Sequence, residues 1–351
     1  VPQLTVQTSN GVVEWRNVAS SFFVMAQQSD KWHHTMSRYL GQNPDTSFLF
    51  GILPGVCREA IGRPDFLYTN QQAFHSDKVY TWSKHHHDKI KRNRFTKVQS
   101  YYGTAPFLWE LGRVAIQNQQ REPEGSLFFL PRDDQVTIRD ESYKEVEQLL
   151  HDAPKPRSVL LPWRTCDIWK QWELINIPED YTMIQMSNPI IRQETLSKLF
   201  LKHQHIYIPW PGTDIYYAGF LQKDVIIYDN IKQYRTKQKH EMQREMEVVL
   251  NHLKWGYDYL TKKQKDFFEW TCGWQRLDPG DRSHMVTTFL GLDVIKSPIV
   301  LFNDLQQHGF LEPDRVFHQQ ESWEQAYEWI LSHKPEGYST TSKGRSMFEL
   351  L

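Results

Sequence analysis

The chain has 351 residues, which is long for a single core and sufficient for two domains. Its formal net charge is −1, so no overall field recruits nucleic acid or an anionic membrane surface. Charged residues make up 24% of the chain, as in ordinary globular proteins, which argues against disorder throughout.

The three cysteines argue against a disulfide framework and against a zinc site. Cys57, Cys166 and Cys272 are far apart and lack a C-x-x-C spacing, so we expect a reducing compartment. No apolar run approaches the roughly 20 residues that span a bilayer, and the N-terminus lacks a signal-peptide pattern. We therefore expect a cytoplasmic protein with at most peripheral membrane association. The sequence begins at Val1 without Met, which fits a domain of a longer chain.

In the first third of the chain, short apolar runs alternate with helical patterns. The runs predict strands at residues 21–26, 47–53, 78–82 and 96–100, and helices at residues 31–40 and 105–118. The segment 117–125 (QNQQREPEG) is the best candidate for a linker, because it is polar and contains Pro and Gly.

The middle of the chain alternates more clearly. The pattern predicts strands at residues 126–131, 158–163, 181–186, 205–208 and 225–228, with helices at residues 141–153, 167–174, 192–202 and 214–221. Strand-like runs separated by helical ones at this spacing are typical of βαβ units with a parallel sheet. We therefore predict an α/β fold of two Rossmann-like domains facing each other across a cleft. The expected boundaries are 1–122, 123–318, and a C-terminal helix and tail at 319–351.

Three further segments are predicted with less detail. Residues 231–251 are highly charged and are expected to form a solvated helix. Residues 322–332 have the pattern of an amphipathic helix. The polar tail 334–351 is expected to be a linker or a frayed end.

The segment 205–229 (HIYIPWPGTDIYYAGFLQKDVIIYD) is the most informative one in the chain. It predicts a strand, a Pro/Gly turn, a short helix and a second strand. Gly212, Thr213 and Asp214 form a polar turn between the first strand and the helix. Ligands of open α/β sheets bind outside the carboxyl ends of the strands, and the amides at a helix start attract phosphate. The segment therefore predicts a phosphorylated ligand. The alternative is that Thr213 or Asp214 only caps the helix.

Three segments in chain order carry a resemblance to a known family. They are residues 79–83 with 98–109 (VYTWS and VQSYYGTAPFLW), residues 127–131 (LFFLP) and residues 212–229 (GTDIYYAGFLQKDVIIYD). Together they resemble glycosyltransferases of the two-domain GT-B type, in particular those of bacterial capsule and O-antigen gene clusters. The resemblance implies transfer of a sugar from a nucleotide-sugar donor to a glycan or lipid-linked glycan acceptor. It places the donor mainly on residues 123–310 and the acceptor on residues 1–122.

The resemblance also implies donor-binding residues. The Gly212 amide, the Thr213 hydroxyl and the helix dipole would hold the diphosphate. Tyr216 and Tyr217 would add a hydroxyl or a stacking face. The loop after the third strand of this domain contributes Ser187 and Asn188, and Arg192 stands in for the cation usually found there. Many GT-B enzymes have a Glu near the donor helix, whereas Asp214 is the only acid at this place.

An inverting transferase also needs a base for the acceptor hydroxyl. Asp30 and His33, after the strand predicted at 21–26, are candidates for the base and its orienting partner. Asp133 and Asp134, after the strand predicted at 126–131, form a second pair. The alternatives are a helix cap with surface histidines for the first pair and a turn for the second.

Other patterns exclude rival functions. The basic run 84–94 (KHHHDKIKRNR) has neither metal-ligand spacing nor interleaved aromatics, so we expect a solvated helix, with no metal site and no nucleic-acid partner. There is no Asp-x-Asp motif, so no metal requirement is expected. Phosphate-loop, dinucleotide and nucleophile-elbow motifs are also missing. Two alternatives stay open: a polyol-phosphate transferase or nucleotide-sugar epimerase on the same scaffold, or a non-catalytic glycan- or nucleotide-binding module.

Overall fold

The computed structural model describes residues 4–8, 11–15, 34–42, 51–52, 78–92, 99–118, 122–130, 140–161, 175–185, 189–209, 212–228, 262–311, 313–337 and 339–349. The chain divides into two compact units. The first unit comprises Val1–Gln119 and Met285–Lys334, and the second comprises Gln120–His284 and Pro335–Leu351. The chain thus returns to the first unit before it ends in the second, a course that the expected domain boundaries did not include.

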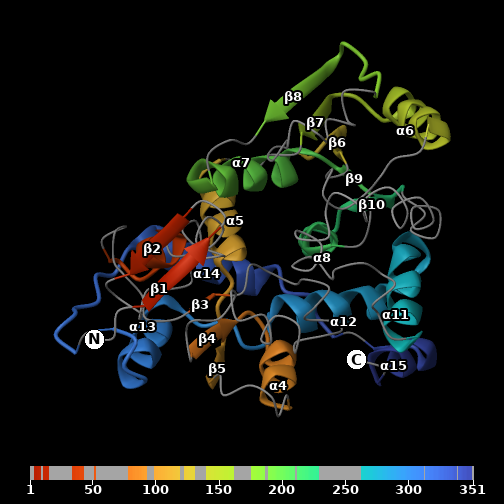
Figure 1. Ribbon diagram of the computed structural model, residues 1–351. Coiled ribbons are helices and arrows are strands. Elements are labelled where there is room, and N and C mark those ends of the chain that lie inside the picture. The colour runs from red at the N-terminus through yellow and green to blue at the C-terminus, as the bar shows by residue number, and fades with distance from the viewer. Residues whose placement is uncertain are drawn as a thin grey trace. The chain divides into compact units, whose positions relative to one another are not determined.

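The second unit is built on a five-stranded sheet (Figure 1). All its strands are parallel, and their order is β10-β9-β6-β7-β8. The strands are β6 (Ser126–Phe129), β7 (Arg157–Leu161), β8 (Tyr181–Gln185), β9 (His205–Ile208) and β10 (Asp224–Ile227). Each coincides with a predicted strand, so the α/β class and the parallel sheet are confirmed.

Helices cover both faces of this sheet. Successive strand residues point to opposite faces, and Phe128 and Phe129 show which helix covers which face. Phe128 belongs to a buried cluster with Val146 and Leu150 of α6 (Asp140–Asp152). Phe129 instead contacts Phe200, which lies on α7 (Pro189–Lys202) and in turn contacts Tyr217 of α8 (Thr213–Phe220). The second unit is therefore a doubly wound three-layer structure.

The first unit contains a smaller parallel sheet, in the order β3-β4-β5. Its strands are β3 (Gly51–Ile52), β4 (Lys78–Thr81) and β5 (Gln99–Tyr102), followed by the helices α4 (Lys84–Arg92) and α5 (Pro106–Gln117). Residues 34–39 are also helical, as predicted. An antiparallel hairpin of β1 (Leu4–Thr8) and β2 (Gly11–Trp15) precedes them, and the sequence analysis did not anticipate it. The strand predicted at 21–26 lies outside the described residues.

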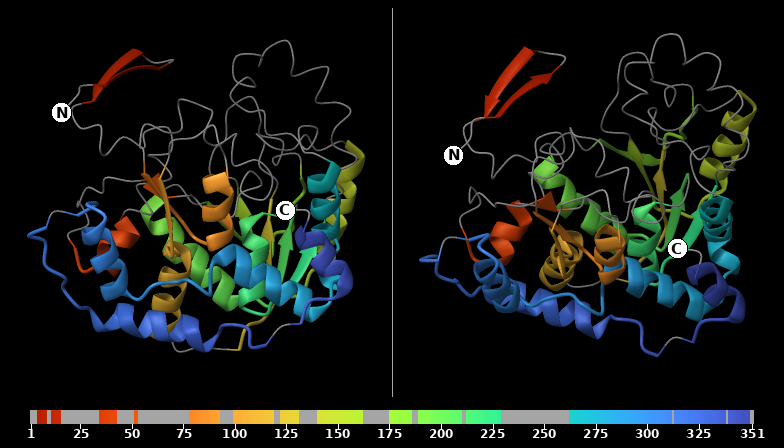
Figure 2. Two further views of the ribbon diagram at one scale, coloured as in Figure 1. Left: turned by 90° about the horizontal axis from the view of Figure 1, so that it is seen from below. Right: turned by 60° about the horizontal axis from the view of Figure 1, so that its bottom comes forward.

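The returning segment packs on the first unit through α13 (Pro298–Gln307) and α14 (Glu321–Ser332). In Figure 2 the gold α5 crosses the blue α14, and the two helices approach closely because Gly112 has no side chain. A Cβ at Gly112 would lie 2.7 Å from the Ala326 carbonyl oxygen. Trp323, Ala326 and Ile330 are buried along this contact. The contact explains why residues 285–334 belong to the first unit.

The basic helix α4 is not solvated on all sides, contrary to the expectation for residues 84–94. His86 is only 1% exposed, and the rings of His85 and His86 contact Phe289. Lys84 is exposed. The histidine side of this helix thus belongs to the interior of the first unit, because the imidazole rings pack as aromatic side chains.

The end of the chain is docked on the second unit rather than frayed. The helix α15 (Ser342–Glu349) places Phe348 against Phe267 of α11 (Lys262–Cys272). The buried Asp281 of α12 (Pro279–Leu290) accepts hydrogen bonds from the Thr341 amide at 2.9 Å and from the Thr341 hydroxyl at 2.7 Å. The Thr341 hydroxyl oxygen also caps the Gly344 amide. One aromatic anchor and one capped terminus therefore order a polar tail. The described part of the chain contains no helix long and apolar enough to cross a membrane.

Candidate functional site at the carboxyl edge of the second sheet

The strand order of the second unit fixes where a ligand would bind. The chain proceeds outward from β6 to β7 and β8, then returns to the other side of β6 for β9 and β10. The order therefore reverses between β6 and β9, which pair directly, Phe128 opposite Tyr207. Ligands of open α/β sheets bind at such a switch point, outside the carboxyl ends of the strands. The Gly212–Asp214 turn follows β9 at this point.

Gly212 is not required by the backbone or by its described neighbours. Its dihedral angles are extended, φ −135° and ψ −169°, and any residue adopts such values. Among the described residues, the atom nearest to an added Cβ is Asp214 Oδ2, 4.0 Å away. Gly125, which precedes β6, is the opposite case: its φ is +66°, and a Cβ would lie 2.0 Å from the Pro156 carbonyl oxygen. Among the described residues, therefore, neither the backbone nor a neighbouring atom explains why position 212 has no side chain.

The helix after this turn is held by its aromatic residues. Tyr216 is 1% exposed and its ring meets Trp274 edge-on at 6.1 Å, while Tyr217 is 4% exposed and meets Phe200 edge-on at the same distance. Burial raises the pKa of both hydroxyls, so both tyrosines are neutral at physiological pH. These packed rings fix the start of α8 in place. The direct ligand contacts expected of Tyr216 and Tyr217 stay predictions.

Thr213 and Asp214 occupy the first turn of α8 and are half-buried. The helix begins with Gly212 as its N-cap, so no side chain from that position covers its first amides. An acid in the first turn is favourable to the helix dipole, but the N-cap is Gly212, so neither Thr213 nor Asp214 has the capping position considered for them. The Asp214 charge also contributes to the raised pKa of Tyr217.

Comparison with protein-family models, with curated proteins and with solved structures finds no match. The site is therefore defined by its own geometry.

The structure locates only part of the other predicted residues. Arg192 lies in the first turn of α7, which follows β8, and its side chain is outside the description. The strand β8, which precedes α7, is separated from β9 by β7 and β6. The remaining predicted residues lie outside the described ones: Asp30, His33, Asp133, Asp134, Ser187 and Asn188.

Tyr228 is a residue of this edge that the sequence analysis did not consider as a site residue. It directly follows β10, its amide donates to the Ile208 carbonyl at 3.1 Å, and its hydroxyl donates to the Phe129 carbonyl at 2.6 Å. Its side chain therefore reaches across the end of β9 to the end of β6. The sequence shows that Tyr228 follows a predicted strand, as Gly212 does. Only the strand order shows that these two strands, β10 and β9, are neighbours.

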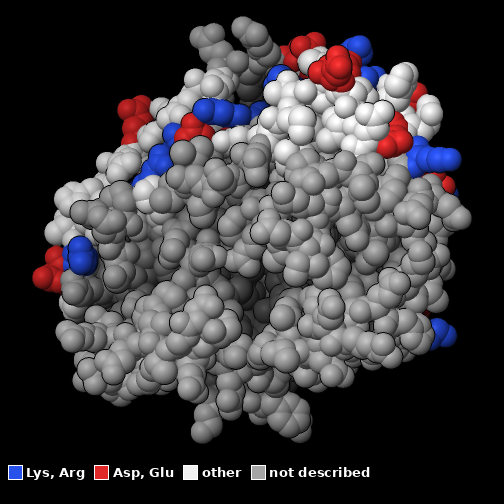
Figure 3. Space-filling model, turned by 45° about the horizontal axis from the view of Figure 1, so that its top comes forward, with Lys and Arg blue, Asp and Glu red and all other residues white. Residues whose placement is uncertain are grey.

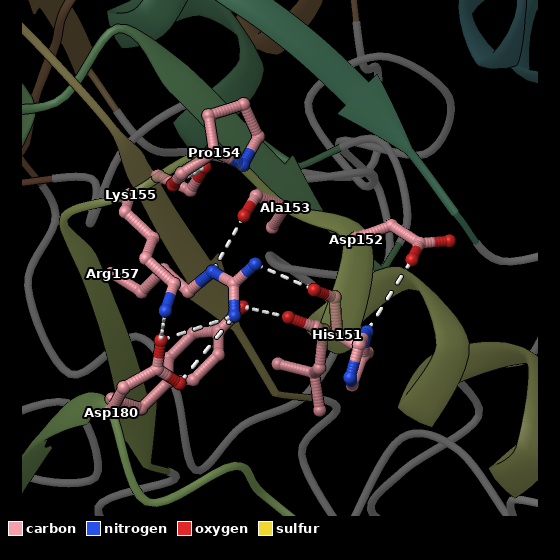
Figure 4. Close-up of polar contacts among 10 residues, drawn as sticks. His151, Asp152, Ala153, Pro154, Lys155, Arg157 and Asp180 are labelled. Atoms are coloured by element: carbon pink, nitrogen blue, oxygen red, sulfur yellow. Dashed lines mark hydrogen bonds and ion pairs between the residues drawn. The ribbon is translucent and has the colours of Figure 1, made fainter.

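The amino edge of the same sheet is occupied by structural contacts (Figure 4). Arg157 donates to the carbonyls of His151 and Ala153, which end α6, and it also pairs with Asp180. A hydrogen bond from Lys155 holds the pKa of Asp180 below its usual range. Cations at the carboxyl end of a helix form hydrogen bonds with its last carbonyls. These structural contacts account for the charged residues of this cluster, and no ligand is needed to explain them.

A buried histidine ties three strands together at that amino edge. His203 is fully buried, with Nε2 2.9 Å from the Ser158 hydroxyl and Nδ1 3.2 Å from the Glu124 carbonyl oxygen. The carbonyl can only accept, so Nδ1 carries the proton and Nε2 accepts from Ser158. Burial lowers the pKa of His203 to about 4, which keeps the ring neutral.

In the first unit, the chain itself covers the carboxyl edge of the sheet. A Cβ at Gly291 would lie 2.0 Å from the Trp82 carbonyl oxygen, and one at Gly103 would lie 2.6 Å from the Val294 carbonyl oxygen. The Lys296 amide donates to the Gly103 carbonyl at 3.2 Å. The segment 291–296 therefore lies against the ends of β4 and β5.

A half-buried carboxylate adds a further contact. Asp304 of α13 accepts hydrogen bonds from the Tyr80 hydroxyl and from Lys296 Nζ, both at 2.7 Å. Burial raises the pKa of the Tyr80 hydroxyl, so it remains a donor to Asp304. The contact holds α13 against β4.

The charged side chains of the described surface do not indicate the sign of the ligand's charge. On the described part of the face in Figure 3, Lys and Arg lie among Asp and Glu, so the described residues there favour neither sign. Within the described ranges, no group of three or more His, Cys, Asp or Glu side chains is arranged to hold a metal ion.

Proposed function

We propose that this protein is a glycosyltransferase that moves a sugar from a nucleotide-sugar donor to a surface polysaccharide or another glycan acceptor. In this proposal it is a cytoplasmic protein with the two Rossmann-like domains of the GT-B type. The second unit binds the donor, and the first unit binds the acceptor. One observation carries the proposal: the Gly212–Asp214 turn follows β9 at the switch point of the second sheet.

The chemistry of the turn suits a departing nucleoside diphosphate. Sugar transfer leaves negative charge on the diphosphate, and the amides and dipole at the start of α8 would offset it. The missing side chain at Gly212 would let a phosphate oxygen approach the backbone. The Thr213 hydroxyl would add a donor. In this proposal the amides and the dipole, rather than a metal ion, meet the charge.

Of the two residue pairs proposed to supply the catalytic base, the strand order favours Asp133 and Asp134 for a position near the donor. Asp133 and Asp134 belong to the loop after β6, and β6 is the immediate neighbour of β9. That loop starts about one strand spacing, ~4.8 Å, from the end of β9. Asp30 and His33 belong to the first unit, and we propose them for the acceptor side.

A thermal-shift panel of nucleoside diphosphates and nucleotide-sugars tests the proposal. A ligand present at about 100 times its Kd should stabilise the folded state by about 2.7 kcal/mol. We expect at least one nucleoside diphosphate and its nucleotide-sugar to stabilise the protein. Thr213→Ala should weaken the binding of both. The absence of any stabilisation across the panel would contradict donor binding.

Product analysis with the best donor then separates the functions. Transfer to a glycan acceptor is the expected result. Conversion of the free donor without an acceptor would identify an epimerase instead. Binding without any conversion would identify a non-catalytic module.

A further inference from the structure

Two polar side chains of α7 are buried without a hydrogen-bond partner. Gln193 is 3% exposed and Ser197 is 0% exposed. Neither Gln193 Oε1 nor the Ser197 hydroxyl oxygen has a hydrogen-bond partner among the described residues. A polar group that leaves water without gaining a partner destabilises the folded state, so such groups are rare in folded proteins. Two of them on adjacent turns of one helix indicate a common cause.

Other buried hydroxyls of the second unit do have partners. Ser126, at the start of β6, donates to the Pro154 carbonyl at 2.8 Å. Thr271 of α11 donates to the carbonyl of the residue four positions earlier, Phe267, at 2.9 Å. Ser197 also lies inside a helix, yet its hydroxyl does not form this bond. The unpaired hydroxyl is therefore particular to this face of α7.

Both side chains lie on the face of α7 that carries Phe200. At about 100° per residue, Gln193, Ser197 and Phe200 lie within about 60° of one another around the helix. Phe200 contacts Phe129, the last residue of β6, and Tyr217 of α8, the helix that follows β9. This face of α7 is therefore directed at the switch point between β6 and β9.

The two residues also lie at the level where α8 begins. Both helices lead from the carboxyl edge of the sheet back to its amino edge, because each joins two parallel strands. At about 1.5 Å per residue, Ser197 lies about 4.5 Å and Gln193 about 10.5 Å nearer the start of α7 than Phe200 does. The start of α8 lies about 6 Å before Tyr217, the residue that contacts Phe200. Along the helix axis, the two polar groups thus lie on either side of that start.

We infer that Gln193 and Ser197 bind a hydroxyl group of the ligand whose phosphates the start of α8 holds. The inference rests on the proposed function, which supplies that ligand. Both side chains are uncharged, and an amide and a hydroxyl can each donate and accept, as a sugar hydroxyl also does. Phosphate oxygens suit the amides of α8 instead. Side chains of a binding surface commonly change rotamer on binding, which would turn these covered groups toward the ligand.

Isothermal titration of the full chain tests the inference. The ligands are UDP, ADP and GDP, then UDP-glucose, ADP-glucose and GDP-mannose, and inorganic pyrophosphate, which has no sugar hydroxyl. We expect Ser197→Ala and Gln193→Met each to raise the Kd of the bound nucleotide or nucleotide-sugar about 5-fold, as for the loss of one hydrogen bond. The Kd of pyrophosphate should not change. A ribose hydroxyl would affect the nucleoside diphosphate and the nucleotide-sugar alike, whereas a hydroxyl of the transferred sugar would affect the nucleotide-sugar alone.

Thermal unfolding distinguishes a ligand contact from a structural one. Because the replaced groups have no partner, the Tm of Ser197→Ala and of Gln193→Met should equal or exceed that of the wild type. Ser126→Ala is the matched control, since it removes a buried hydroxyl that has a partner, at the amino edge. Its Tm should fall by about 2–4 °C while its Kd values stay unchanged. If Gln193→Met does not fold, Gln193→Leu replaces it.

The outcomes separate the inference from the proposed function. Wild-type protein that binds none of the nucleotides or nucleotide-sugars would contradict both. Wild-type protein that binds them, with the same Kd in Ser197→Ala and Gln193→Met, would overturn the inference alone. Equal loss of nucleotide and pyrophosphate affinity, or a Tm lowered as in Ser126→Ala, would show that the two residues only support the fold.

Discussion

Glycines near the carboxyl edges of the two sheets differ in backbone conformation and in their described surroundings. In the first unit, Gly291 and Gly103 have positive φ values of 68° and 105°, and their missing side chains let the segment 291–296 lie against the strand ends. In the second unit, Gly212 has an extended backbone and no described atom closer than 4.0 Å to an added Cβ. The same residue type is thus required by close packing at one edge, whereas at the other no described atom requires it. A glycine in a strand-to-helix turn is therefore informative only when its φ and its surroundings are known.

The largest expected effect comes from removing a glycine that the fold requires. Gly291→Ala combines a positive φ with a Cβ 2.0 Å from the Trp82 carbonyl oxygen, so we expect it to destabilise the first unit by about 2–4 kcal/mol. Denaturant unfolding measures the loss. If Gly291→Ala is as stable as the wild type, the segment 291–296 does not seal the first sheet and the comparison fails.

Acid should destabilise the second unit at the edge opposite the proposed ligand. The unfolded chain protonates His203 near pH 6.5, whereas the folded chain does so only near pH 4. Between these values the unfolded state binds more protons, so the free energy of unfolding should fall as the pH drops from 6.5 to 4. The contribution is about 3 kcal/mol at most, from 1.36 kcal/mol per pKa unit.

His203→Gln tests this assignment. Glutamine has a donor and an acceptor for Glu124 and Ser158 but does not titrate. Unfolding measured from pH 7 to pH 4 should therefore depend less steeply on pH in the variant than in the wild type. An unchanged slope would mean that other groups cause the acid sensitivity.

A smaller effect is expected where the chain end docks. Asp281→Ala removes the acceptor for both the Thr341 amide and its hydroxyl, and should cost about 2 kcal/mol. Hydrogen exchange of the α15 amides should become faster. Asp278→Ala is the matched control, because Asp278 is exposed and accepts only the local Gly280 amide. Equal exchange in the two variants would show that Asp281 does not hold the tail.

The sequence predicted the five strands of the second sheet but not which strands are neighbours. Apolar runs between turns indicate each strand, because a strand buried on both faces must be apolar along its length. The pairing of β6 with β9, which creates the switch point, depends on contacts between residues about 80 positions apart, such as Ser126 with His205. No local pattern records that pairing, so Tyr228 could not be connected with Gly212.

Burial explains the other differences. The histidines of α4 and the polar tail carry residues typical of surfaces, yet His86 packs near Phe289 and Thr341 is fixed by Asp281. The amphipathic pattern of residues 322–332 correctly predicted a helix but did not say that it would pack on α5. A helix face shows that it needs a partner, and only the folded chain identifies which one.

The central claim is that the open backbone at Gly212 is there for a phosphate. The most direct measurement compares Gly212→Ala with the wild type, by titration with the best nucleoside diphosphate and by denaturant unfolding. We predict that the unfolding free energy falls by about 1 kcal/mol, because alanine is a poorer N-cap than glycine, and that the protein stays folded. The Kd should rise about tenfold, which corresponds to about 1.4 kcal/mol. Unchanged nucleotide affinity in a fully folded Gly212→Ala protein would contradict the claim.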